Sequence, residues 1–202
     1  NTVPDLLHSL LRMDHASHNS CGQVVHGHQG HTQSPPRLHR HRRAQRASAW
    51  IEHMAQSGLT DLNGLQAQVG MGHTGSTGSV SATGPQALLH ALPHLSHGPN
   101  ADLNSPARIA VVVHGQMHAS PALRDALGER GYRCKSQSNA ELLAHLIDAA
   151  YQHDPVQAVR RALTKPASAA GLLSAQDCVH HKTFSGALGH RLLDVATIVP
   201  KP

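Results

Sequence analysis

The sequence predicts one layered domain of the α/β (α+β) class, and two features carry that prediction. Residues 108–115, RIAVVVHG, form an uninterrupted apolar run closed by a glycine, which is typical of a buried strand. Two adjacent amphipathic helical patterns follow between residues 120 and 151. The 202 residues are enough for a single core, so we expect these strands and helices to pack against one another as layers.

Four segments combine the apolar spacing of amphipathic helices with helix start signals. Residues 4–13 place leucines at every third or fourth position behind Pro4 and Asp5, which suit a first turn. Residues 138–151 begin with a Ser or Asn cap and a glutamate in the first turn. The four predicted helices are 4–13, 120–131, 138–151 and 155–163.

Short strands are predicted where apolar runs end at glycine or at polar turns. Residues 59–66 are expected to form a short helix or a turn, and a loop rich in glycine and serine covers 75–84. Besides 108–115, the predicted strands are 21–27, 49–55, 68–74, 132–136, 169–176 and 192–199.

Composition limits the class of protein. Lys and Arg number 17 against 12 Asp and Glu, so the net charge is +5, and 20 histidines add charge on acidification. Three widely spaced cysteines predict a reducing, intracellular compartment without a disulfide. No apolar run is long enough to span a membrane. The chain starts at Asn1, so a removed organelle (mitochondrial) presequence and a sequence boundary are both open interpretations.

A basic run, RLHRHRRAQR, occupies residues 37–46. Such a density of arginine favours contact with phosphates of a nucleic acid or with an acidic protein partner, although a solvated surface is the simpler alternative. No aromatic residue lies within the run for stacking on bases. The candidate partner-contact residues are Arg37, Arg40, Arg42, Arg43 and Arg46.

Histidine pairs are the candidate metal ligands. His26 with His28, His39 with His41, and the group His90, His94 and His97 could each present two imidazoles together. No cysteine or carboxylate lies at a spacing that completes four ligands. We therefore expect no metal and no other cofactor, and a histidine-rich metal-binding protein is the weakest of the functional hypotheses.

The order of motifs resembles a known family. A Cys-Gly pair before a strand, GMGHT at 70–74, ALPHLS at 91–96, IAVVVHGQMHASPALRDALGERGY at 109–132 and SQSNAELLAHLI at 136–147 follow one another. This order is similar to the glutaminase domain of class II glutamine amidotransferases, most of all the glutaminase half of glutamine:fructose-6-phosphate aminotransferase. The resemblance covers roughly residues 21–176 and is strongest over 108–147.

The resemblance implies a fold and a chemistry. The family consists of N-terminal-nucleophile hydrolases with a four-layer αββα sandwich. A first-residue cysteine attacks the glutamine side-chain amide, its own α-amine acts as base, and an oxyanion hole stabilises the tetrahedral intermediate. By this resemblance Cys21 descends from the nucleophile, His114 and Gly115 occupy the oxyanion position, and His73, Thr74, Thr77 and Asn139 occupy substrate-binding positions.

Several charged positions depart from the family pattern. Gly75 stands where the family has the arginine that clamps the substrate carboxylate. His114 stands in place of the oxyanion asparagine, and Asn139 in place of an aspartate. Twenty residues precede Cys21, so its α-amine is part of a peptide bond unless that bond is cut.

These departures predict a catalytically degenerate glutaminase-like domain that serves as a structural or interaction subunit of a larger assembly. We expect residues 1–20 to be an N-terminal arm or uncleaved pro-segment, and residues 21–202 to be the glutaminase-like domain. The alternative is an active amidotransferase that hydrolyses glutamine to glutamate and ammonia once Cys21 is freed.

Overall fold

A computed structural model describes residues 2–29, 35–57, 64–75, 92–102, 104–114, 119, 121–164 and 194–198. The chain divides into two compact units, Asn1–Pro93 and His94–Pro202, which we describe one at a time. Each unit contains one three-stranded sheet whose neighbouring strands all run antiparallel. This is the mixed helix and sheet structure that the sequence predicts.

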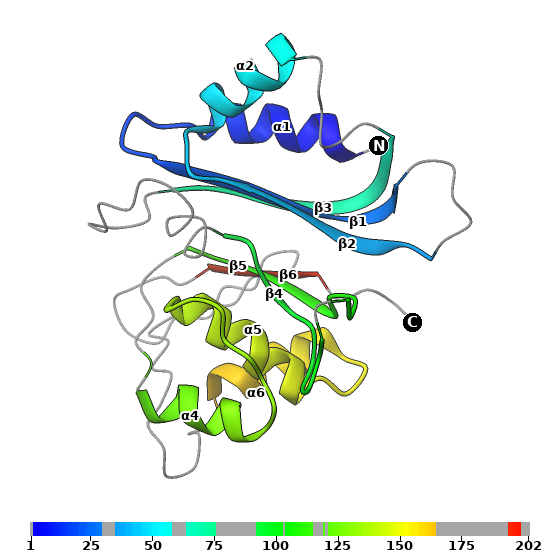
Figure 1. Cartoon of the computed structure of the whole chain (residues 1–202), viewed down its shortest axis with the longest axis vertical. Helices are drawn as coiled ribbons and strands as arrows, with labels where there is room; N and C mark the ends of the chain where they lie inside the picture. The colour runs from blue at the N-terminus through cyan, green and yellow to red at the C-terminus, as the bar shows by residue number, and fades with distance from the viewer. Residues whose placement is uncertain are drawn as a thin grey trace. The chain divides into compact units, whose positions relative to one another are not determined.

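Unit 1 is a sheet covered by two helices. Helix α1 (Thr2–Arg12) leads to β1 (Ser20–Gln29) and β2 (Arg37–Arg43), which are followed by α2 (Ala47–Ser57) and β3 (Leu65–Gly75). The strand order is β2-β1-β3, so β1 is central. Both helices lie on the same face of the sheet (Figure 1).

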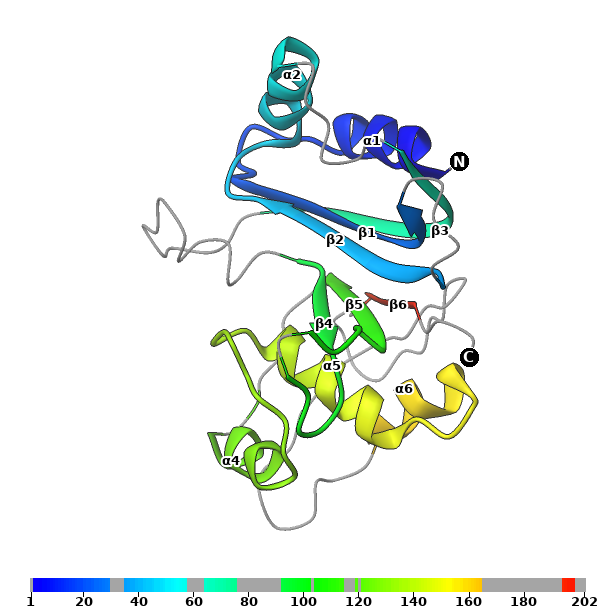
Figure 2. The ribbon, with the colours of Figure 1, turned by 45° about the vertical axis from the view of Figure 1, so that its right-hand side comes forward.

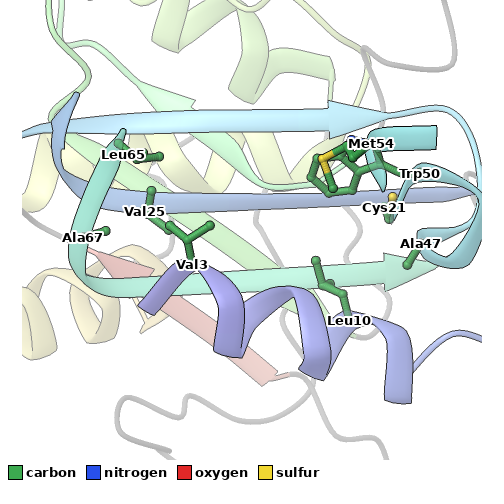
Figure 3. Packing of buried hydrophobic residues seen from close by; sticks show 9 residues of the cluster. All are labelled: Val3, Leu10, Cys21, Val25, Ala47, Trp50, Met54, Leu65 and Ala67. Carbon is green, nitrogen blue, oxygen red and sulfur yellow. The ribbon is translucent and has the colours of Figure 1, made fainter. Parts of the chain in front are cut away.

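The core of unit 1 lies between this sheet and its helices. Figure 3 shows Val3 and Leu10 of α1 and Trp50 and Met54 of α2 directed into one apolar cluster with residues of the strands. Helix α1 can approach β3 closely because β3 has glycines at the positions beneath the helix. A Cβ at Gly72 would lie 2.9 Å from Leu10 Cδ2, and one at Gly70 would overlap Leu6 Cδ1.

Unit 2 packs helices on one face of a second sheet (Figure 2). Strand β5 (Ile109–His114) is central between β4 (His94–Ser96) and β6 (Asp194–Ile198). Helices α4 (Pro121–Glu129), α5 (Asn139–Ala150) and α6 (Pro155–Thr164) follow β5 in the chain. Buried leucines and an isoleucine of α5 pack with the buried apolar run of β5, as the 3.6-residue period predicts.

The four predicted helices and the strands at 21–27, 68–74, 108–115 and 192–199 are confirmed, with shifts of a few residues at their ends. Ser138 is the N-cap of α5, and its side chain accepts a hydrogen bond from the Ala140 amide. Gly131 ends the turn after α4 with φ of 86°. The predicted strand at 169–176 lies outside the described residues.

Two strand predictions are wrong, and two strands were not predicted. Residues 49–55 belong to helix α2, because Trp50 and Met54 are one helical turn apart and enter the core together. Residues 132–136 form no strand, because the amides of Lys135 and Ser136 donate to the Glu141 carboxylate. The additional strands are β2, within the basic run, and the short β4.

Candidate functional site

Cys21 is the second residue of the central strand of unit 1, not the start of a chain. It pairs with Thr74 of β3 on one side and with Arg43 of β2 on the other. The preceding residue, Ser20, continues the same strand, and its hydroxyl donates to the Gly75 carbonyl at 3.0 Å. With the bond between Ser20 and Cys21 intact, the nitrogen of Cys21 is a peptide nitrogen.

The Cys21 thiol faces the helices and belongs to the apolar core. Cys21 is only 1% exposed, and Figure 3 places its sulfur beside Trp50. Burial, followed by the Asp14 carboxylate, raises the pKa of the thiol to about 12, while Arg43 acts in the opposite direction. A thiol in this environment is protonated at neutral pH.

The carboxylate near Cys21 has a structural task. Asp14 Oδ2 accepts hydrogen bonds from the Ser48 amide at 3.1 Å and the Ser48 hydroxyl at 2.6 Å, at the start of α2. Arg46 forms an ion pair with the same oxygen at 3.3 Å. These interactions outweigh the opposing effect of burial and lower the pKa of Asp14. Asp14 therefore caps α2 from a position 34 residues upstream of Ser48.

Three of the predicted substrate-binding positions lie together at the end of β3. His73, Thr74 and Gly75 pair with Gly22, Cys21 and Ser20 of β1. The Thr74 hydroxyl donates to the Met13 carbonyl at 3.2 Å, so it fixes the turn after α1. A Cβ at position 75 would lie 2.5 Å from His73 Cε1, so any side chain there requires the imidazole to move. Thr77 lies outside the described residues.

The remaining predicted site positions belong to unit 2. His114 is the last residue of β5 and pairs with Asp194 of β6. Asn139 is the first residue of α5, directly after the Ser138 cap, and is half-buried. Gly115 lies outside the described residues. Glu141 is buried and its carboxylate binds the segment before α5, accepting from the Ser136 amide and the Ser136 hydroxyl, each at 2.7 Å.

Unit 2 also contains a buried polar cluster that the sequence did not predict. The Ser96 hydroxyl donates to Asp148 Oδ2 at 3.2 Å and lies 3.0 Å from His145 Nδ1. Arg108 forms an ion pair with Asp148 at 3.3 Å. The available signal was the presence of His145 and Asp148, three residues apart, among the apolar positions of α5.

This cluster does not have the arrangement of a catalytic triad. In a triad the histidine lies between the serine and the acid, whereas here the serine lies between His145 and Asp148. The three residues are 0%, 4% and 4% exposed for Ser96, His145 and Asp148. A substrate cannot reach them, so we interpret the cluster as the polar link between α5 and β4.

The predicted partner-contact arginines lie on and after β2. Arg46 is paired with Asp14, the guanidinium carbon of Arg43 lies 5.6 Å from the Trp50 ring centre, and Arg40 donates to the Pro93 carbonyl at 3.4 Å. Arg37 is exposed and Arg42 is half-buried. Part of the predicted contact surface thus also stabilises unit 1.

Metal sites and membrane spans are absent from the part of the chain that the structure describes. There, no three His, Cys, Asp or Glu side chains come close enough together to hold a metal ion. None of the described helices combines the length and apolar character needed to cross a bilayer.

No family model matches the chain. Among curated proteins it is similar to the glutamine–fructose-6-phosphate aminotransferases of two strains of Thermus thermophilus, at 29% identity over 163 residues and at 30% over 164 residues. It is also 29% identical over 163 residues to the Bordetella pertussis enzyme. Each alignment covers 81% of this chain but 23% of the relative, so the chain spans about a quarter of their length.

Among solved structures, the chain is similar to a glutamine phosphoribosylpyrophosphate amidotransferase from B. subtilis complexed with ADP and GMP. The TM-score is 0.53 at 18% identity, over 79% of this chain and 30% of that one. The predicted fold class, that of the N-terminal-nucleophile amidotransferases, is thereby confirmed. The chain is a glutamine amidotransferase-like domain. Within that class, its sequence resembles the glutamine–fructose-6-phosphate aminotransferases named above.

Proposed function

We propose that this chain is a glutaminase-like domain that does not hydrolyse glutamine and instead serves as a structural or interaction subunit of a larger assembly. The observation that carries the proposal is the state of Cys21. Its thiol is 1% exposed within the apolar core, and its nitrogen lies in a peptide bond inside β1. Neither the nucleophile nor the base of the family's reaction is available in this arrangement.

The electrostatics support the same proposal. With its pKa raised to about 12, the Cys21 thiol is protonated at pH 7. Burial and the Asp14 carboxylate both oppose ionisation, and Arg43 compensates for them only in part. An active nucleophilic cysteine needs the opposite environment, electropositive and partly exposed.

The positions that would hold the substrate support the proposal independently of Cys21. Gly75 offers no guanidinium for the substrate carboxylate, and the His73 ring occupies the space where a side chain at 75 would begin. Asn139 has no charge with which to pair the substrate amine. Losing both charged contacts removes the interactions that orient an amino acid through its two ends.

The catalytic part of the proposal is tested by ammonia release. The full chain is incubated with glutamine, the Cys21→Ser variant is the matched control, and intact mass shows whether the bond between Ser20 and Cys21 is cut. We expect no ammonia above the control and an uncut bond. Glutamine hydrolysis that depends on Cys21, together with quantitative cleavage before it, would overturn the proposal in favour of an active amidotransferase.

The assembly part needs a separate measurement. The native mass of the chain after gentle purification from its own cells is expected to exceed that of the 21.5 kDa polypeptide. A monomer found alone under those conditions contradicts a subunit role, whatever the outcome of the glutamine assay.

A further inference from the structure

An irregular segment of unit 2, residues 131–137, joins α4 to α5 (Figure 1), and we call it the covering segment. Its second residue, Tyr132, is buried, and the ring centres of Tyr132 and His145 are 5.1 Å apart with their planes inclined by 43°. His145 Nδ1 lies 3.0 Å from the Ser96 hydroxyl of β4. The ring of His145 is therefore enclosed between α5, β4 and the covering segment.

The Glu141 carboxylate fastens the covering segment to α5. Its two oxygens accept hydrogen bonds from the Lys135 amide at 2.9 Å and from the Ser136 amide at 2.7 Å. Arg124 of α4 donates to the Ser136 carbonyl at 2.7 Å. The end of the segment next to α5 is thus held by hydrogen bonds, whereas Tyr132 contacts His145 through its ring.

The hydrogen bonds of Ser96 indicate which nitrogen of His145 carries the proton. A serine hydroxyl has one hydrogen, and that of Ser96 is donated to Asp148 Oδ2 at 3.2 Å. In the contact between the same hydroxyl and His145 Nδ1, the nitrogen must then be the donor. The neutral ring is thereby assigned its hydrogen on Nδ1, and the position left for a second proton is Nε2.

A proton on Nε2 would place a charge where water does not reach. His145 is 4% exposed, and its Nε2 has no hydrogen-bond partner among the residues that the structure describes. An imidazolium formed there loses hydration without gaining a hydrogen bond, which is unfavourable. The enclosed ring therefore resists a proton that an exposed histidine accepts.

The groups around His145 compensate for its burial only in part. Burial lowers the pKa of the ring, whereas the Glu141 and Asp148 carboxylates raise it. The Arg133 backbone also raises this pKa, and His97, just beyond β4, lowers it. The buried residues of β5 and α6, which also pack against α5, are apolar. Other titratable or charged side chains on or beside these elements are His94, Arg108, Arg124, Arg130, Tyr132 and Cys134, and those of Arg133 and Lys135 are exposed.

We propose that the covering segment is a pH-responsive strap that opens locally when His145 takes up a proton on Nε2. Opening moves Tyr132 away from the ring and lets water hydrate the imidazolium. The covering segment is the part of the enclosure that yields, because it belongs to neither a helix nor a sheet, whereas α5 and β4 do. This device goes beyond the proposed function and does not involve Cys21.

Hydrogen exchange of the full chain at pH 7.5 and pH 5.5, mapped by mass spectrometry and corrected for intrinsic rates, tests the role of the proton. We expect protection of residues 131–137 to fall about fivefold to tenfold at the lower pH. The reason is that the opened ring regains the ordinary pKa of 6.5, so acid stabilises the open form more than the closed one. Protection that is unchanged between the two pH values would overturn the proposal.

Two variants assign the effect to His145. His145→Gln is expected to remove the pH dependence of exchange in residues 131–137. The matched control is His153→Asn, which replaces an exposed histidine of the same unit whose ring lies 6.3 Å from that of Tyr151 and whose φ of 67° suits asparagine. A dependence that persists in His145→Gln, or disappears in His153→Asn, would overturn the proposal.

Two measurements on the unaltered chain separate local opening from global unfolding and check the proton position. Exchange in residues 131–137 at pH 5.5 is expected to be nearly independent of low urea concentrations, whereas exchange in β5 rises with urea, because local opening exposes little surface. Equal urea dependence in both regions would refute local opening. Ring nitrogen chemical shifts at pH 7.5 are expected to show His145 protonated on Nδ1, and a proton on Nε2 would overturn the assignment. None of these readouts depends on glutamine hydrolysis or native mass, so a failure here leaves the proposed function standing.

Discussion

The two units bury different kinds of side chain. Unit 1 is held by an apolar cluster around Trp50 and Leu10, and the thiol of Cys21 is part of that cluster. The acids and histidines that are buried as whole residues in the described part of the chain belong to unit 2: His94, Glu141, His145 and Asp148. Unit 1 has one covered carboxylate, Asp14, whose side chain is 3% exposed. Apolar packing therefore dominates the stability of unit 1, whereas the stability of unit 2 depends more on hydrogen bonds to ionisable groups. Such hydrogen bonds are sensitive to the replacement of a single side-chain atom and to pH.

The largest expected effect is in the apolar cluster of unit 1. Trp50→Ala removes a fully buried ring and is expected to lower the free energy of unfolding by about 3–5 kcal/mol. Trp50→Phe is the matched control. Since Trp50 Nε1 has no hydrogen-bond partner among the residues that the structure describes, this change should cost far less. Urea unfolding measures both, and a loss below about 1 kcal/mol for the alanine variant contradicts the packing account.

The next effect concerns the carboxylate at the start of α5. Glu141→Gln places an amide against the Lys135 and Ser136 amides, which now donate to Glu141 at 2.9 and 2.7 Å. We expect a loss of about 2 kcal/mol by urea unfolding, because a charged buried acceptor is removed. Glu129→Gln, at the exposed end of α4, is the control and should be near neutral. If Glu141→Gln and Glu129→Gln lowered the free energy of unfolding equally, the buried carboxylate would have no special role in unit 2. That result would contradict the contrast drawn between the two units.

A smaller effect is expected where unit 1 does use a carboxylate. Asp14→Ala deletes the cap of α2 and is expected to cost about 1 kcal/mol at pH 7. Because the pKa of Asp14 is lowered in the folded chain, its contribution is complete above pH 3.8 and is lost as pH falls through the lower folded value. The difference between variant and wild type should therefore shrink in acid, and a difference that grows there would contradict the assignment.

The last prediction concerns the pH dependence of stability that the buried histidine of unit 2 causes. Burial lowers the pKa of His145, although Glu141 and Asp148 oppose the shift, so the folded chain resists the proton that the unfolded chain accepts near pH 6.5. Stability should fall as pH drops below that value, and His145→Gln should flatten this slope. His8→Gln, exposed on α1, is the control. An unchanged slope in His145→Gln refutes the prediction.

Local sequence patterns are sufficient to predict the helices whose start or end signals lie in or next to the helix itself. Ser138 and Glu141 mark the start of α5, and Gly131 marks the end of the preceding helical turn, all within the segment itself. Helix α2 has no such signal nearby, because its cap is Asp14, which the fold brings from 34 residues upstream of Ser48. That interaction is invisible in the sequence, so the pattern of residues 49–55 favours a strand when it is taken alone.

The candidate site shows the same limit. Motif order was enough to predict the amidotransferase-like fold, because that order reflects the succession of strands and helices. It could not show that the side chain of Cys21 faces Trp50, since one residue of register in a strand moves a side chain to the other face. Nor could it show that Ser96, in the unpredicted β4, lies between His145 and Asp148.

The most direct test of the account is the reactivity of Cys21 in the folded chain. A glutamine-like diazoketone is added to the full chain with and without a concentration of urea that unfolds it, and modified peptides are mapped by mass spectrometry. The account predicts no modification of Cys21 in the native chain and full modification by a general thiol reagent after unfolding. Stoichiometric modification of native Cys21 by the diazoketone would contradict it.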